Sequence, residues 1–99
     1  ERALGLTTKR VVEESKMSGA PGAATSIFKL VGSSLTKSGS ELKSQLRGTA
    51  GLVWDSEDFD QDELDSTRGW LRDRAVTIYG GTNEVQQNII AKRVLGLPD

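Results

Sequence analysis

The sequence has 99 residues, 35% of them hydrophobic, with a formal net charge of −1 and neither cysteine nor histidine. This composition excludes disulfides, thiolate and imidazole chemistry and ordinary zinc sites, and it predicts no metal site. The near-neutral charge provides no general attraction to nucleic acid, and no apolar run approaches the roughly 20 residues needed to cross a membrane. The low hydrophobic content and the start at Glu1 rather than methionine lead us to expect part of a larger protein.

Two helices are predicted in the first half of the chain. The first covers residues 1–17 and has its apolar residues near one face. The glycine- and proline-containing stretch 17–22 predicts a loop. The second helix covers residues 23–47, and Gly39 interrupts its apolar stripe, which favours close packing of a neighbouring helix there over a ligand contact. The stripe consists of Ile27, Leu30, Val31, Leu35, Leu42 and Leu46.

An acidic segment precedes the third predicted helix. Residues 54–65 contain seven acidic side chains and no basic one, and we expect a solvated loop because the spacing and central glycine of a calcium-binding EF-hand are absent. Asp60 and Glu63 have the spacing of a capping box, so the helix is predicted at 61–78. Its predicted inner face is Leu64, Leu71, Ala75 and Ile78. The helix has three arginines, Arg68, Arg72 and Arg74. We predict that they form surface ion pairs or, alternatively, contact a neighbouring subunit.

Paired glycines separate the third helix from the last one. Gly80 and Gly81 cost a helix about 1 kcal/mol each, and Thr82 can then cap a new helix, predicted at 83–95. The elbow presents backbone N–H groups at a helix start, where an anionic or hydrogen-bonding ligand is favoured. With no strand-like alternation, the sequence predicts an all-α antiparallel helical bundle, part of a four-helix bundle.

The elbow and the final helix resemble a known family. The runs IYGGTNEVQ from Ile78 and NIIAKRVLGLP from Asn88 resemble the C-terminal signature of the acyl-CoA dehydrogenases, flavoproteins that oxidise fatty acyl-CoA thioesters. The resemblance implies that residues 1–99 are the C-terminal helical-bundle domain of a larger flavoprotein, which builds the tetramer and covers FAD. It also implies oxidation of an acyl-CoA to the trans-2-enoyl-CoA and an electron-transfer flavoprotein as partner. Separately, we expect a cytoplasmic location. The 99 residues alone are not expected to be active.

The segment QLRGTAG, residues 45–51, resembles the family's glutamine-x-x-glycine-glycine-x-glycine sequence. The resemblance implies that Gln45, Gly48 and Thr49 contact FAD bound mainly by another subunit. Thr49 replaces the second glycine of the family pattern. A glycine-terminated helix explains Gly48 equally well, so both interpretations stay open.

The elbow supplies the remaining candidate site residues. By the resemblance, Thr82, Asn83 and Glu84 contact FAD, and Tyr79 and Gly80 line the acyl pocket near the thioester. Helix capping explains Thr82 as well and does not exclude a flavin contact. Glu84 is not predicted to be the catalytic base, because an acidic residue is favoured electrostatically in the first turn of any helix.

The chain departs from the family pattern at Gly80. Many members have the catalytic glutamate at this position, and glycine cannot remove the substrate's α-proton. No catalytic residue is therefore predicted here. The base either lies on an earlier helix, as in some relatives, or is missing, as in a structural partner subunit of a heteromeric enzyme. A cofactor-free helical interaction module is a further alternative. Lys92 and Arg93 are expected to face solvent rather than the nucleotide end of CoA.

Overall fold

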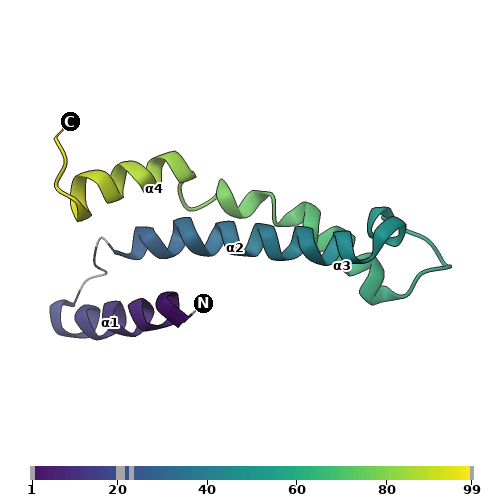
Figure 1. Ribbon diagram of the computed structural model, residues 1–99, viewed down its shortest axis with the longest axis horizontal. Helices are drawn as coiled ribbons and strands as arrows, with labels where there is room; N and C mark the ends of the chain where they lie inside the picture. Colours follow the sequence, from purple (N-terminus) through teal and green to yellow (C-terminus); the bar gives the residue numbers. More distant parts are fainter. Residues whose placement is uncertain (1, 20–21, 23, 99) are drawn as a thin grey trace. The chain divides into compact units, whose positions relative to one another are not determined.

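The computed structural model describes residues 2–19, 22 and 24–98. All the regular secondary structure assigned among these residues is helical (Figure 1). The predicted all-α class is confirmed. No helix in this part of the chain is long and apolar enough to span a membrane. The α-helices are α1 (Arg2–Ser18), α2 (Thr25–Leu46), α3 (Gln61–Arg72) and α4 (Asn83–Ile89). The 3₁₀-helices are η1 (Gly48–Leu52) and η2 (Ala75–Thr77), and η3 (Ile90–Val94) is a π-helix that continues α4.

Glycines end the first two helices close to the predicted positions. Helix α1 continues through Ser18, one residue beyond the prediction, and Gly19 ends it with a φ of 71°. Helix α2 ends at Leu46, shortly before Gly48, whose φ is 58°. Both glycines adopt the left-handed conformation that side chains disfavour. The predicted helical residues Glu1 and Ala23, and residues 20–21 of the predicted loop, lie outside the described residues.

The chain divides into two compact units. One consists of residues 1–32 and 81–99, and it contains α1, the start of α2, α4 and η3. The other consists of residues 33–80, and it contains the rest of α2, η1, α3 and η2. The candidate FAD contacts of residues 45–49 therefore belong to the second unit, and those of residues 82–84 belong to the first.

Within the second unit, α2 and α3 run antiparallel. Arg47, just beyond α2, donates a hydrogen bond to Asp62 in the first turn of α3. Arg74, beyond the other end of α3, donates to the backbone carbonyl of Lys37 at 3.0 Å and lies 3.7 Å from Glu41. Later residues of α3 thus meet earlier residues of α2, as they do when two helices pass in opposite directions.

The face of α3 that meets α2 and η1 is largely polar. Glu63 lies 3.9 Å from Arg47, and the hydroxyl of Thr67 donates to the carbonyl of Gly51 at 3.1 Å. Trp70 follows Thr67 at a spacing of three, which places these two residues on one side of α3, and Arg74 lies beyond the end of the helix. Hydrogen bonds and ion pairs, together with the buried side chain of Leu64, therefore hold α3 in place.

Of the predicted inner face of the third helix, only Leu64 is buried by the described residues. Leu64 is buried at 6% exposure, but Leu71 and Ile78 are 45% and 64% exposed, and Ala75 is also exposed. The helix also ends six residues before the predicted position 78. After Arg72 the backbone tightens into the 3₁₀-helix η2, beginning with a bond from the N–H of Arg74 to the carbonyl of Leu71 at 3.2 Å.

Helix α2 likewise buries small polar residues instead of its predicted apolar stripe. Ser26, Ser33 and Ser44 are 8%, 7% and 9% exposed. A Cβ placed on Gly39 meets no atom within 4 Å, so the close packing predicted there is not made by the described residues. The exposed members of the stripe are Val31, Leu35, Leu42 and Leu46.

The predicted capping box at the start of α3 is confirmed. The carboxylate of Asp60 accepts a hydrogen bond from the backbone N–H of Glu63 at 2.8 Å, and the carboxylate of Glu63 accepts one from the N–H of Asp60 at 3.1 Å. Two N–H groups that the helix cannot satisfy internally thereby gain acceptors.

Replacement of Asp60 by alanine is expected to lower the free energy of unfolding by about 1 kcal/mol, because one capping acceptor is lost. The control is Asp58→Ala, which removes a charge from the same acidic segment but leaves the capping box intact. Thermal or denaturant unfolding of the full-length protein measures the difference. Equal effects of the two substitutions would show that the box does not stabilise α3.

Asp62 is expected to make the free energy of unfolding depend on pH in the acid range. The hydrogen bond from Arg47, followed by the charge of Lys43 at 3.6 Å, lowers the pKa of Asp62 below its ordinary value of 3.8. A lowered folded-state pKa means that the stabilisation is fully present above the unfolded-state pKa and is lost as the pH falls through the folded-state pKa.

The substitution Asp62→Asn should therefore destabilise the protein at pH 6, and the difference from the native protein should shrink steadily below about pH 4. Because Asp62 is exposed, added salt should also reduce the difference at pH 6. Denaturant unfolding at several pH values tests both points, with Asp58→Asn as the control. A difference that stays constant down to acid pH would contradict the assignment.

Candidate cofactor site

The glycine pair of the elbow has the backbone conformation that only glycine adopts easily. The φ angles of Gly80 and Gly81 are 67° and 97°. A Cβ on Gly81 would lie 2.6 Å from Nε2 of Gln86, whose side chain is 6% exposed. Gly81 therefore has two reasons to lack a side chain: its own φ and the glutamine packed beside it.

Thr82 begins α4 as its N-cap, as predicted. Its φ and ψ are −64° and 166°, and its hydroxyl accepts a hydrogen bond from the N–H of Val85 at 3.4 Å. Asn83 follows, and its buried Oδ1 has no hydrogen-bond partner among the described residues. A buried acceptor without a donor is costly, so this oxygen fits a site that a ligand or further protein completes.

Glu84 has the electrostatics of a helix first turn. Its own backbone N–H and the hydroxyl of Thr82 hydrogen-bond to the carboxylate and lower its pKa below the ordinary value. A general base needs a pKa raised toward the working pH, because a weakly basic carboxylate abstracts protons poorly. The lowered pKa of Glu84 supports the prediction that it is not the catalytic base.

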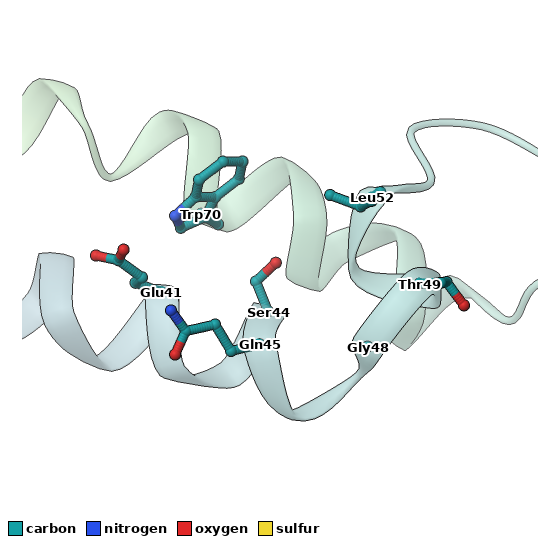
Figure 2. Close-up of a pocket in the computed structure, with 7 residues that line it drawn as sticks. All are labelled: Glu41, Ser44, Gln45, Gly48, Thr49, Leu52 and Trp70. Atoms are coloured by element: carbon teal, nitrogen blue, oxygen red, sulfur yellow. The ribbon is translucent and has the colours of Figure 1, made fainter.

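Gln45, Gly48 and Thr49 line one cavity in the second unit, with a volume of about 410 Å³ (Figure 2). We name it the Gln45 cavity; Leu52 and Trp70 also line it. Gln45 is on α2, Gly48 and Thr49 are in η1, and Trp70 reaches the cavity from α3. The structure thus brings together three residues that the family resemblance had selected as FAD contacts.

Gly51 fixes the shape of the chain beside this cavity, for a reason that sequence reasoning missed. Its carbonyl oxygen accepts hydrogen bonds from the hydroxyls of Ser44 at 3.0 Å and Thr67 at 3.1 Å. A Cβ on Gly51 would collide with the backbone carbonyl of Ser44 and lie 2.9 Å from its Oγ. Gly51 is therefore required by the close approach of η1 to α2.

Tyr79, which the family resemblance assigns with Gly80 to the acyl pocket, is exposed. The side chain of Tyr79 is 61% exposed, and its backbone N–H donates to the carbonyl of Ala75 at 3.1 Å. Both residues belong to the unit of residues 33–80. Their assignment to an acyl pocket therefore stays a prediction.

Two of the three arginines in and just after α3, Arg68 and Arg74, form ion pairs. Arg68 lies 3.6 Å from Asp55 and 4.0 Å from Asp65, and its guanidinium is 5.5 Å from the ring centre of Trp54. Arg74 pairs with Glu41. The prediction of surface ion pairs is confirmed for these two arginines. Part of the acidic segment is thus neutralised by Arg68 instead of being solvated throughout.

The described residues offer groups that suit a dinucleotide cofactor. The Gln45 cavity combines an amide, two hydroxyls, exposed backbone, an aromatic ring and the carboxylate of Glu41, which pairs with Arg74. Pockets for organic ligands have this mixture of apolar walls and few polar groups. Asn83 adds an unpaired acceptor in the other unit. The residues present therefore fit FAD, although the contacts themselves stay predictions.

Residues 1–95 match the family described as acyl-CoA dehydrogenase, C-terminal domain. The chain belongs to the acyl-CoA dehydrogenase family. The resemblance seen in the elbow and final helix is thereby confirmed, and the all-helical structure agrees with the C-terminal domain.

Curated relatives support the same assignment. The chain is 50% identical over 58 residues to acyl-CoA dehydrogenase IpdE1 of Mycolicibacterium smegmatis, a match that covers 59% of this chain and 14% of that protein. It is 30% identical over 97 residues to acyl-CoA dehydrogenase FadE34 of Mycobacterium tuberculosis, covering 98% of this chain and 12% of that protein. The chain thus corresponds to a small part of these relatives. No solved structure matches significantly.

Proposed function

We propose that this chain is the C-terminal helical part of an FAD-dependent acyl-CoA dehydrogenase of fatty acid metabolism, which oxidises an acyl-CoA to the trans-2-enoyl-CoA. The observation that carries the proposal is that Gln45, Gly48 and Thr49, near neighbours in the sequence, line a cavity that Trp70 of α3 also lines, in a chain of this family. The proposal includes a cytoplasmic homo- or hetero-tetramer and an electron-transfer flavoprotein as electron acceptor.

Each group in this chain has a role in binding rather than in the chemical step. Gln45, the Gly48–Thr49 backbone and the first turn of α4 at Thr82, Asn83 and Glu84 hold FAD by hydrogen bonds. FAD, when bound, supplies the acceptor for the hydride from the substrate's β-carbon. Tyr79 and Gly80 contribute a wall of the acyl pocket, which excludes water from the reacting carbons.

The base that removes the α-proton lies elsewhere in the full protein. Gly80 has no side chain to act on the substrate. Glu84 keeps its charge and has a lowered pKa, so it is a poor base. The required carboxylate then comes from another helix, and the C-terminal part shapes the pocket into which that carboxylate projects.

Gly80 also favours a second candidate function, that of a partner subunit without its own base. Its φ of 67° is a conformation in which a glutamate would be strained by about 1–2 kcal/mol. The elbow is therefore adapted to glycine at this position. In this alternative the chain holds FAD or oligomer contacts while another subunit supplies the base.

Purification of the full-length protein tests the proposal. We expect a yellow preparation with the absorption bands of oxidised flavin, which bleach when an acyl-CoA is added anaerobically and which support reduction of a dye. A preparation that binds FAD but needs a second gene product for activity would favour the partner-subunit alternative. A protein that neither binds FAD nor reacts with any acyl-CoA would overturn both candidates.

A further inference from the structure

Trp70 lines the Gln45 cavity from α3, whereas Gln45 lines it from α2. Figure 2 shows the indole ring extending from α3 across from Glu41 and Gln45 of α2. Gln45 and Trp70 are 25 positions apart in the sequence, and the antiparallel pairing of α2 with α3 brings them to one cavity. The resemblance that selected Gln45 did not select this tryptophan.

The ring is held in a fixed position by Arg74. The guanidinium of Arg74 lies 5.4 Å from the centre of the Trp70 ring, within the range of a cation–π interaction. Arg74 is itself fixed by bonds to the carbonyls of Lys37 at 3.0 Å and Trp70 at 3.3 Å and by the ion pair with Glu41. Trp70 thus forms an aromatic wall of the cavity that packs against Arg74.

The indole N–H of Trp70 is unsatisfied in the described chain. Its Nε1 is buried and has no hydrogen-bond partner among the described residues. Leaving a buried donor unpaired costs about 1–3 kcal/mol, whereas a phenylalanine ring would avoid the cost. A tryptophan at this position is therefore poorly explained by packing of α3 on α2 alone.

We propose that Trp70 packs its indole ring against a flat ring of FAD bound in the Gln45 cavity. This inference rests on the proposed function, because the cavity's other polar residues are the predicted FAD contacts. An aromatic wall beside an amide, a hydroxyl and open backbone suits a planar heterocycle with hydrogen-bonding edges, and stacking of a base on an aromatic side chain contributes about 1–3 kcal/mol.

Trp54 provides a matched control within the same unit. It is 57% exposed, it follows η1, and its ring is near Arg68 rather than at the Gln45 cavity. The chain has only these two tryptophans. A cofactor in the Gln45 cavity should therefore affect Trp70 and leave Trp54 unchanged.

The first experiment labels the full-length protein with 5-fluorotryptophan and records its ¹⁹F spectrum with and without FAD. The resonances are assigned with the variants Trp70→Phe and Trp54→Phe. The Trp70 resonance should move on saturation with FAD, and the Trp54 resonance should not. An unmoved Trp70 resonance in a protein that demonstrably binds FAD would overturn this inference alone. Failure of the native protein to bind FAD would overturn the proposed function as well.

The second experiment measures FAD affinity by titrating the apoprotein. Trp70→Leu should weaken FAD binding about tenfold or more, Trp70→Phe should retain most of the affinity because a ring remains, and Trp54→Leu should have no effect. Parallel titration with FMN, which lacks the adenosine, identifies the ring: a loss for both cofactors indicates the isoalloxazine, and a loss for FAD alone indicates the adenine. Native affinity in Trp70→Leu, or an equal loss in Trp54→Leu, would refute the contact.

Discussion

Replacement of Gly51 by alanine is expected to lower the free energy of unfolding by about 3 kcal/mol, near the upper end of the range for an overpacked buried position. The added Cβ would collide with the backbone carbonyl of Ser44, and backbone cannot rotate away as a side-chain tip can. Separation of η1 from α2 would then weaken the two hydrogen bonds that Gly51 accepts from Ser44 and Thr67.

The matched control for this substitution is Gly69→Ala. Gly69 lies within α3, and a Cβ there meets no atom within 4 Å. Because alanine favours a helix over glycine by about 1 kcal/mol, Gly69→Ala should be neutral or stabilising. Denaturant unfolding of the full-length protein measures both variants. A Gly51→Ala protein as stable as the native one would show that η1 does not pack on Ser44 as described.

Replacement of Gly81 by alanine is expected to lower the free energy of unfolding by about 2–3 kcal/mol and to weaken FAD binding. The φ of 97° is strained for any residue with a side chain, and the new Cβ would displace the buried Gln86 amide. Relaxation of either strain moves the start of α4, and with it Thr82 and Asn83. The loss of FAD affinity rests on the proposed function, whereas the loss of stability does not.

Gly96→Ala is the control for Gly81→Ala. Gly96 also has a positive φ, 66°, but a Cβ there meets no atom within 4 Å. The Gly96→Ala substitution should therefore lower the free energy of unfolding by about 1 kcal/mol, from backbone strain alone, and leave FAD affinity unchanged. Thermal unfolding and FAD titration of the two variants separate the effects. Equal losses of stability in both would mean that the Gln86 contact contributes nothing.

Features set by neighbouring residues were predictable from the sequence. The capping box of Asp60 and Glu63 and the cap at Thr82 each depend on residues three positions apart, so their spacing alone indicates them. The glycine breaks near residues 19, 48 and 80 are also local, because they arise from the backbone freedom of glycine. For these reasons the number and approximate positions of the helices followed from the sequence.

The helix faces could not be predicted in the same way. An apolar stripe normally marks the buried side of a helix, but α2 buries serines, Thr67 of α3 bonds to η1, and Arg74, beyond the end of α3, bonds to α2. These orientations depend on partners 16 and 37 positions away in the sequence, Gly51 and Lys37. The large apolar side chains that remain exposed, such as Leu42 and Leu46, are available to contact further protein.

The candidate site was partly accessible from the sequence. The family resemblance selected Gln45, Gly48 and Thr49, and the structure places them at one cavity. It could not select Trp70, because that residue reaches the cavity only through the pairing of two helices. The sequence shows a tryptophan three positions after Thr67. This spacing indicates a cavity residue only once it is known that the Thr67 side of α3 faces η1 and α2.

A structure of the full-length protein with FAD tests the central claim most directly. We predict that FAD contacts Gln45 and Trp70 in the Gln45 cavity, and that Thr82 at the start of α4 also contacts a flavin. The claim would be contradicted if the Gln45 cavity were filled by protein side chains, or if Thr82 lay on an open surface far from the flavin.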